Sequence, residues 1–264
     1  MSGPRNREFE PAGAGGTRTR LFVGEALAAG GVVGLSANQA HYLRNVLRLE
    51  KGARVALFNG ADGEWTGVIE GFGKGWASVA LEAQSRPQKV EPDLWLLFAP
   101  IKHGRIDYLV QKAAELGAAR LLPVLTEFTQ VARVNTERLA ANAQEAAEQT
   151  GRLSVPEVAE PRRLMDALAG WDSSRRIMLC DESGHGRPVM EVLSDLPRGQ
   201  PWAVLIGPEG GFSEAELDAL RKLPFVTSVS LGPRLLRADT AAVAALACWQ
   251  AALGDWPDET PGAG

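Results

Sequence analysis

Runs of apolar residues alternate with segments of helical periodicity over most of the chain after residue 93. The runs are typical of short strands buried on both faces of a parallel sheet, and they cover residues 94–99, 121–125, 177–180, 203–206 and 226–231. Helical spacing of apolar positions predicts helices over 106–116, 135–150, 164–168, 189–196 and 214–220. Strands that alternate with helices in this way predict an α/β domain with a mostly parallel sheet.

The pattern before residue 84 is different. Short alternating or apolar stretches at 55–58, 64–70 and 76–81 are separated by Gly-containing turn dipeptides, which predicts a small β-rich domain. One amphipathic helix interrupts it at 37–48, with Ala40, Leu43, Val46 and Leu47 on its inner face. We therefore expect a leader at 1–17 without fixed structure, a β-domain at 18–84, a Pro-containing linker at 85–92, an α/β domain at 93–256 and a tail at 257–264.

Composition narrows the class of protein. Hydrophobic residues make up 45% and charged residues 23% of the 264, as in ordinary water-soluble proteins. No apolar run approaches the roughly 20 residues of a membrane span, and the first twenty residues lack the apolar core of a signal peptide. We therefore expect a cytoplasmic protein that is not bound to membranes. Two scattered cysteines and three histidines predict buried thiols and no metal site.

The charge is unevenly distributed. The formal net charge of −4 argues mildly against a nucleic-acid partner. Residues 18–86, however, carry eight basic and six acidic side chains, so the β-domain is basic within an acidic chain. A nucleic-acid partner for this domain stays open.

Two loops after predicted strands are the strongest functional signal. Residues 207–211 read G-P-E-G-G and are followed at Ser213 by the helix-capping pattern S-x-x-E. Residues 231–237 read L-G-P-R-L-L-R, and either Asp239 or Thr240 is expected to cap an Ala-rich helix that runs to about Leu253. Both common nucleotide-binding patterns are absent. The loops predict a ligand crevice at the carboxyl ends of adjacent parallel strands, and two ordinary tight turns are the alternative.

The sequence around these loops resembles a known family. I-G-P-E-G-G-F-S-x-x-E at 206–216 and L-G-x-R-x-L-R-x-x-T-A at 231–241 are similar to motifs of the 16S rRNA (uracil(1498)-N(3))-methyltransferase family, a branch of the SPOUT class. The pattern K-x-x-R-x-D-x-x-V-Q-K-x-x-E-L-G at 102–117 and E-A-x-E-Q-x-G-R at 145–152 extend the resemblance. The family usually has Thr and Glu where this chain has Ala238 and Asp239.

The resemblance implies a fold and an activity. The fold is a SPOUT-type, mostly parallel sheet with a C-terminal trefoil knot, preceded by a small PUA-like β-barrel that binds RNA. The activity is methylation of N3 of a uridine, position 1498, in 16S ribosomal RNA of the small ribosomal subunit, with S-adenosyl-L-methionine as cofactor. The protein is expected to be a homodimer that completes the site. Free ribosomal RNA and the assembled subunit both stay open as substrates.

The resemblance also implies roles for individual residues. Arg237 is the first choice and Arg234 the second for stabilising charge that develops on the uracil carbonyl oxygens. Glu209 accepts the N3 proton, directly or through a water, or else caps neighbouring loop amides. Cofactor contacts are expected largely from backbone groups, with Leu179 beside the adenine, and the set is Leu179, Leu205, Ile206, Gly207, Pro208, Glu209, Gly210, Gly211, Leu231, Gly232, Leu235 and Leu236.

Basic residues of both domains are implied as RNA contacts. They are Arg18, Arg20, His41, Arg44, Arg48, Lys102, Arg105 and Arg234. The alternative for those in the β-domain is an ordinary solvated basic face. Two other functions are kept open at this point: a catalytically inactive RNA-binding protein of the same fold, and a dinucleotide oxidoreductase, which the missing G-x-G-x-x-G disfavours.

Overall fold

The computed structural model describes residues 16–102, 104–131 and 133–256. The expected tail and all but two residues of the expected leader lie outside these ranges. The chain forms two compact units: unit 1 contains the residues up to Val90 together with 147–155, and unit 2 contains Glu91–Ala146 and the residues from Pro156 onward. The structure thus adds residues 147–155 to unit 1. The domain limits inferred from the sequence stay predictions.

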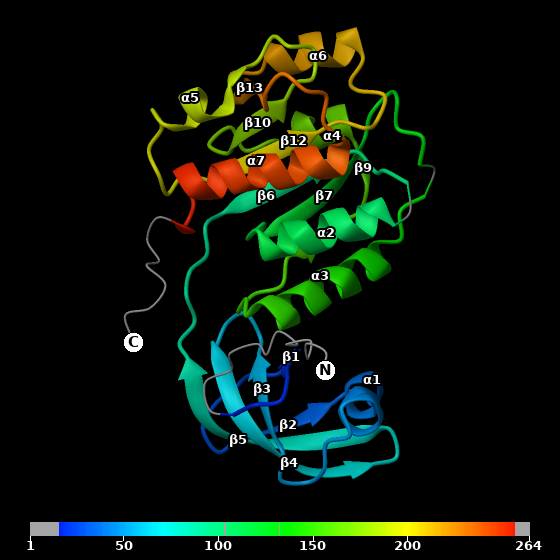
Figure 1. Ribbon diagram of the computed structural model, residues 1–264, viewed down its shortest axis with the longest axis vertical. Helices are drawn as coiled ribbons and strands as arrows, with labels where there is room; N and C mark the ends of the chain where they lie inside the picture. The colour runs from blue at the N-terminus through cyan, green and yellow to red at the C-terminus, as the bar shows by residue number, and fades with distance from the viewer. Residues whose placement is uncertain (1–15, 103, 132, 257–264) are drawn as a thin grey trace, which may run out of the picture. The chain divides into compact units, whose positions relative to one another are not determined.

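Unit 2 is built on a parallel sheet (Figure 1). Its strands follow the spatial order β11-β13-β10-β12-β6-β7-β8, with β9 paired to β7, and every neighbouring pair is parallel. The mostly parallel sheet is therefore confirmed. The strand bounds are β6 Leu94–Phe98, β7 Arg120–Leu125, β8 Glu157–Val158, β9 Arg162–Arg163, β10 Arg176–Cys180, β11 Arg187–Pro188, β12 Trp202–Ile206 and β13 Val226–Ser230.

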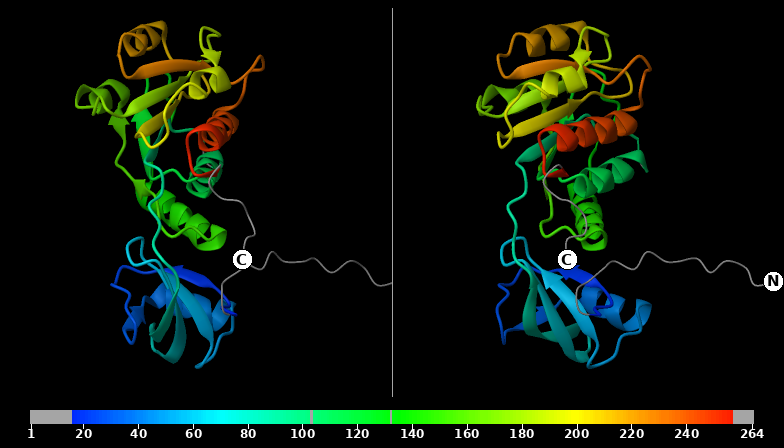
Figure 2. Two further views of the ribbon diagram at one scale, coloured as in Figure 1. Left: turned by 90° about the vertical axis from the view of Figure 1, so that its left-hand side faces the viewer. Right: turned by 60° about the vertical axis from the view of Figure 1, so that its left-hand side comes forward.

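Helices cover both faces of this sheet. Alternation along β6 sends Leu94, Leu96 and Phe98 into one apolar core and Leu97 into the other. The first core contains residues of α2, α5 and α7, and the second contains residues of α4 and α6. Figure 2 shows α2 and α7 on one face and α4 and α6 on the opposite face. The helix bounds are α2 Arg105–Glu115, α3 Thr136–Thr150, α4 Leu164–Ala169, α5 Val189–Leu193, α6 Glu214–Arg221 and α7 Ala238–Ala252.

The starts of α6 and α7 illustrate one correct and one wrong prediction. Ser213 caps α6 with the expected reciprocal bonds to Glu216. Neither Asp239 nor Thr240 caps α7, because the helix already begins at Ala238. Arg237 is the N-cap residue, and its backbone carbonyl accepts the Ala241 N–H at 2.7 Å without a side-chain cap. Asp239 instead lies in the first turn, where its negative charge interacts favourably with the helix dipole.

Unit 1 is a five-stranded mixed sheet. The strands are β1 Arg20–Phe22, β2 Val32–Leu35, β3 Arg54–Phe58, β4 Glu64–Gly73 and β5 Trp76–Arg86, in the spatial order β1-β3-β4-β5-β2. Only β1 and β3 pair in parallel among these strands. The sheet packs around an apolar core that also takes in Ala40 and Leu43.

The helix expected at 37–48 is shorter and changes type. It consists of α1 Ala37–His41 and a π-helical turn, η1 Tyr42–Val46, in which the Leu47 N–H donates to the carbonyl of Tyr42 at 3.0 Å. The wider turn rotates later residues relative to an α-helix. Val46, expected to face inward, is therefore 60% exposed, whereas Ala40 and Leu43 are buried as expected.

A buried cluster of charges lies in unit 1. Glu64 accepts hydrogen bonds from Arg20 and Arg86, both at 2.5 Å, and Glu64 is 1% exposed. Arg20 also donates to the carbonyls of Ala147, Glu148 and Arg152 at 2.8–2.9 Å. Burial by itself raises the pKa of Glu64, but the hydrogen bonds and charges of the two arginines outweigh it and hold this pKa below its ordinary value.

Candidate functional site

The two loops singled out from the sequence lie at one edge of the sheet of unit 2. Parallel pairing brings the carboxyl ends of β6, β12, β10 and β13 to the same edge, as the partners Phe98 and Ile206 illustrate. Loop 207–213 follows β12, loop 231–237 follows β13, and the segment from Asp181 follows β10. Lys102 and Arg105 follow β6. This edge is the ligand-binding side of an open α/β sheet.

The glycines of loop 207–213 are required by close packing. A Cβ at Gly207 would lie 2.9 Å from the ring of Phe212. Gly211 has a φ of +75°, and a Cβ there would lie 2.3 Å from Oε1 of Glu182. The Gly211 N–H donates to the carbonyl of Pro208 at 3.0 Å, which closes a tight turn. The turn leaves Glu209 and Gly210 exposed to solvent.

Hydrogen bonds tie the end of this loop and the helix that follows it to neighbouring segments. Oε1 of Glu182 accepts the Phe212 N–H at 3.0 Å from the segment after β10. Oε1 of Glu216 accepts the Glu127 N–H at 2.9 Å from the segment after β7. The loop is therefore tied at Phe212 to the segment after β10, and α6 is tied to the segment after β7, while Glu209 and Gly210 face solvent.

Several charged side chains at this edge have no partner among the residues that the structure describes. In residues 16–102, 104–131 and 133–256, the side chains of Lys102, Arg105, Glu209, Arg234 and Arg237 make no hydrogen bond or ion pair. All except Arg105, which is half-buried, are exposed. Unpaired guanidinium and carboxylate groups on a shared edge remain available to a polar ligand.

The apolar residues predicted to contact the cofactor divide into two groups. The side chains of Leu179 and Leu205 are fully buried in the core beneath α4 and α6. The side chain of Leu179 therefore belongs to the core, its backbone is what the strand leaves for an adenine, and its contact with the cofactor stays a prediction. In loop 231–237, Leu235 is 86% exposed, Leu231 and Leu236 are half-buried, and Gly232 has a φ of +110°.

The segment after β10 carries a polar network that the sequence did not reveal. Arg221 donates to Oδ2 of Asp181 at 2.7 Å and to Oγ of Ser183 at 2.8 Å. Ser183 Oγ also lies 2.8 Å from Nδ1 of His185. The hydrogen bonds from Ser183 and Arg221 outweigh the effect of burial and lower the pKa of Asp181. In the sequence, the only sign of this polar network is that two acidic residues and a serine directly follow a strand.

The predicted RNA contacts of unit 1 are placed differently from one another. Arg18, His41, Arg44 and Arg48 are exposed, and Arg18 and Arg48 line a shared hollow together with Arg54. Arg48 adopts a φ of 54°, a left-handed conformation that is uncommon for a side chain of this type. Arg20 is only 5% exposed and is bonded to Glu64 and three carbonyls. The prediction that Arg20 contacts RNA is wrong in this conformation, because burial removes it from the surface.

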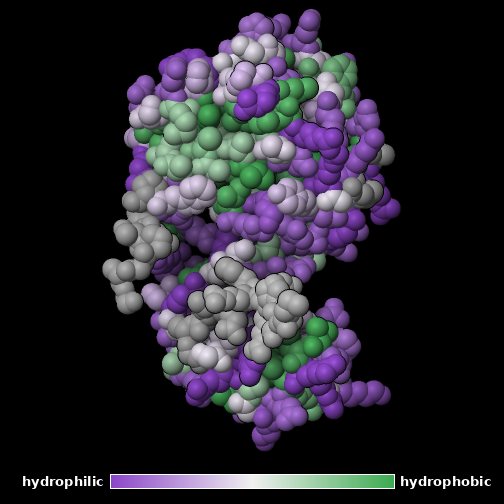
Figure 3. Space-filling model, in the orientation of Figure 1, coloured by the Kyte–Doolittle hydropathy of each residue, from purple (hydrophilic) through white to green (hydrophobic). Residues whose placement is uncertain are grey.

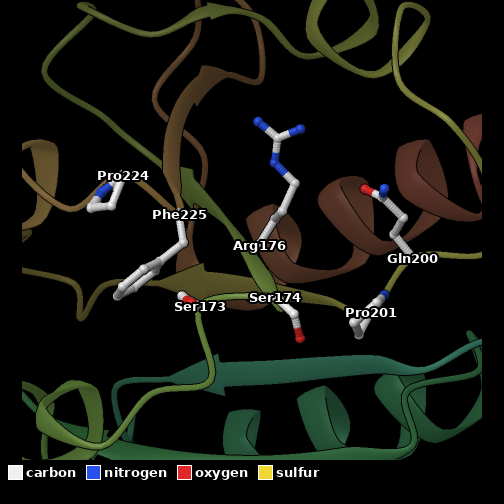
Figure 4. Close-up of a pocket in the computed structure, with 7 residues that line it drawn as sticks. All are labelled: Ser173, Ser174, Arg176, Gln200, Pro201, Pro224 and Phe225. Atoms are coloured by element: carbon white, nitrogen blue, oxygen red, sulfur yellow. The ribbon is translucent and has the colours of Figure 1, made fainter.

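A second hollow lies at the opposite edge of the sheet of unit 2. It has a volume of about 570 Å³ and is formed by residues at or before the amino ends of β10, β12 and β13, among them Arg176 and Phe225 (Figure 4). It is separate from the edge that carries both loops. In the described ranges, no group of three or more His, Cys, Asp or Glu is placed to hold a metal ion. None of the helices described is both long and apolar enough to pass through a membrane.

Two protein families match the chain. An RNA methyltransferase domain matches residues 88–250, and an RNA methyltransferase PUA domain matches residues 35–80. The chain is 32% identical over 231 residues to the ribosomal RNA small subunit methyltransferase E of Rickettsia conorii, a match that covers 86% of this chain and 93% of that protein. It is 27% identical to the protein of the same name from Bacillus subtilis, and this match covers 80% of this chain and 87% of that protein.

Solved structures resemble the chain along nearly their whole length. A methyltransferase from Legionella pneumophila with bound cofactor SAM has a TM-score of 0.79 and 31% identity, covering 90% of this chain and 98% of that one. A ribosomal RNA small subunit methyltransferase E from Neisseria gonorrhoeae bound to S-adenosyl methionine has a TM-score of 0.80 and 27% identity, covering 90% and 99%.

Proposed function

The chain belongs to the family of ribosomal RNA small subunit methyltransferase E, and from this premise we propose that it methylates N3 of a uridine in 16S ribosomal RNA. It is an RNA methyltransferase that uses S-adenosylmethionine. The SPOUT-type parallel sheet and the PUA-like domain are confirmed, while the trefoil knot stays a prediction. The inactive alternative and the oxidoreductase alternative receive no support from these relatives.

The residues at the carboxyl edge fit the cofactor. Loop 207–213 presents a tight backbone in which Gly207, Gly210 and Gly211 carry no side chain, so a flat ligand can approach the main chain at these residues. We propose that backbone groups of 205–211 and 231–236 hold the cofactor. When bound, S-adenosylmethionine supplies a methyl group already activated by its sulfonium.

The charged side chains of the same edge suit the chemistry at the base. Loss of the N3 proton places negative charge on the two flanking carbonyl oxygens of uracil. Arg237 is proposed to stabilise that charge, with Arg234 binding RNA beside it. Glu209, exposed at the loop tip, is proposed to accept the proton, directly or through a water. Lys102 and Arg105 are proposed to position the RNA.

The observation that carries the proposal is the edge itself, where the Gly-rich turn and the charged residues Lys102, Arg105, Glu209, Arg234 and Arg237 follow strands that end on the same side, these five having no bonded partner in the described ranges. Calorimetric titration with S-adenosylmethionine, paired with transfer of labelled methyl groups to 16S ribosomal RNA that lacks the modification, tests it. Binding together with label on a single uridine is expected. Absence of binding, or label on another base, would refute the proposed reaction.

The proposed partners follow from the reaction. The small ribosomal subunit or its RNA is the substrate, which implies action in the cytoplasm. Arg18, His41, Arg44 and Arg48 are proposed to contact RNA phosphates, because they are exposed on the unit that matches a PUA domain.

We also propose that the protein forms a homodimer through α7. This helix is apolar nearly all round: its inner side includes Ala245, Leu246 and Trp249, and its outer side includes Ala244 and Ala247. Figure 3 shows the weakly apolar surface in this region. A helix that is apolar on all sides is usually covered on all sides, and small side chains allow a second copy to approach closely.

Replacing Ala244 on the outer side of α7 by glutamate is expected to convert the dimer into a monomer. The new carboxylates would lie in an apolar interface, where an unpaired charge is costly. Sedimentation velocity measures the change, and Ala215→Glu on the exposed face of α6 is the matched control. A wild-type protein that sediments as a monomer, or an Ala244→Glu variant that stays dimeric, would contradict this interface.

A further inference from the structure

Glu182 is an exposed acidic residue that no motif predicted. It follows β10 directly, and its carboxylate reaches across to the loop after β12. Oε1 accepts the backbone N–H of Phe212 at 3.0 Å. A Cβ added to Gly211 would lie only 2.3 Å from the same oxygen, so a larger residue would clash with Glu182. Glu182 therefore contacts the Gly-rich loop at both residues that end its turn.

The backbone around Glu182 is fixed on each side. Asp181 is 5% exposed and accepts the Ser183 N–H at 2.9 Å, and it also pairs with Arg221 of α6. Ser183 in turn accepts a hydrogen bond from Arg221. Because Asp181 and Ser183 are both hydrogen-bonded to α6, the backbone of Glu182 between them is fixed. Its side chain therefore extends from a fixed position toward Phe212.

The loop needs an external support of this kind. Gly211 is held in a left-handed conformation, and glycine loses more conformational freedom on ordering than any other residue. The hydrogen bond from the Phe212 N–H to an acceptor on a fixed neighbouring segment offsets part of that loss. Phe212 in turn packs its ring against Gly207, so fixing the Phe212 amide orders both ends of the turn.

We propose that Glu182 is a positioning residue that holds loop 207–213 in its cofactor-binding conformation by accepting the Phe212 N–H. The inference rests on the proposed function for its consequence, because the loop is where the cofactor is proposed to bind. Glu182 acts through the loop backbone. The conformation of the loop depends on the hydrogen-bond acceptor of Glu182 more than on its negative charge.

Two variants separate the acceptor from the charge. Glu182→Gln keeps a carbonyl oxygen that can accept the Phe212 N–H, whereas Glu182→Ala removes the acceptor. We expect Glu182→Ala to weaken the affinity for S-adenosylmethionine about tenfold, equivalent to about 1.4 kcal/mol. Glu182→Gln is expected to stay within about twofold of the wild type. Glu191→Ala, at an exposed position on α5, is the matched control.

Amide hydrogen exchange of the protein without cofactor supplies an independent readout. Glu182→Ala is expected to speed exchange of peptides spanning 207–213 about tenfold while the strands stay protected, and Glu182→Gln is expected to match the wild type. Unchanged exchange in Glu182→Ala, or equal defects in both variants, would overturn the proposal. A wild type that binds no S-adenosylmethionine would refute the proposed function, while the exchange data would still decide the role of Glu182.

Discussion

The Arg237→Ala variant should lose methyl transfer while it keeps its affinity for S-adenosylmethionine. Arg237 is the N-cap residue of α7, and its guanidinium makes no bond with the residues that the structure describes. A donor aimed at charge that develops in the transition state contributes about 10²–10³ in rate when mutation removes it. We therefore expect the single-turnover rate to fall by about that factor, and the cofactor dissociation constant to change by less than about threefold.

Arg234→Ala is the matched control, because it removes a second exposed guanidinium from the same loop. It should weaken RNA binding without a comparable loss of the rate at saturating RNA. Single-turnover methylation with the enzyme in excess separates the two effects, since it reports the chemical step apart from release. A normal rate for Arg237→Ala would remove this residue from the reaction, and an equal loss of the saturated rate in both variants would mean that the effect is not specific to Arg237.

The Glu64→Ala variant should destabilise unit 1 by about 3–5 kcal/mol. Removing one member of a buried ion pair leaves the other charge without compensation in a medium of low polarity. Here the remaining charge is that of Arg20, whose side chain is 3% exposed. Urea unfolding followed by hydrogen exchange of peptides from residues 20–86 measures the change in that unit.

Glu82→Ala is the control, because it breaks an exposed ion pair with Arg54 on the same sheet. Surface pairs contribute little, so its cost should stay below about 1 kcal/mol. The effect of Glu64 should also depend on pH. The pKa of Glu64 is lower in the folded state than its ordinary value of 4.5, so its stabilisation is full above that value and is lost as the pH falls through the folded-state pKa. Two outcomes would contradict this role of Glu64. One is an equal loss of unfolding free energy in Glu64→Ala and Glu82→Ala, and the other is a loss in Glu64→Ala that does not shrink in acid.

Local signals made most of the elements predictable. Apolar runs located the central strands of unit 2, and the S-x-x-E pattern located the start of α6 at Ser213. The Gly-rich turn was visible because its glycines are required by backbone conformation and by contacts close in the chain, such as that between Gly207 and Phe212. These features depend on neighbours a few residues away, which a single sequence displays directly.

Features that depend on distant contacts were missed. Arg20 resembled a surface cation, but its partner carbonyl at Ala147 lies 127 residues away in the sequence. Glu182 reaches Phe212 across 30 residues, and nothing in its own neighbourhood indicates that contact. Val46 was misplaced for a local reason, because a π-helical turn shifts the phase that an α-helical pattern assumes.

The return of residues 147–155 to unit 1 limits how this protein can be divided or recombined. The polypeptide crosses between the units three times, after Val90, after Ala146 and after Val155. A fragment that ends at Val90 would leave Arg20 without its three carbonyl acceptors and Phe58 without its packing partners Ala147 and Leu153. Unit 1 therefore cannot be transferred to another protein as one continuous segment. A chimaera between relatives must exchange both of its segments, the residues up to Val90 and residues 147–155, together.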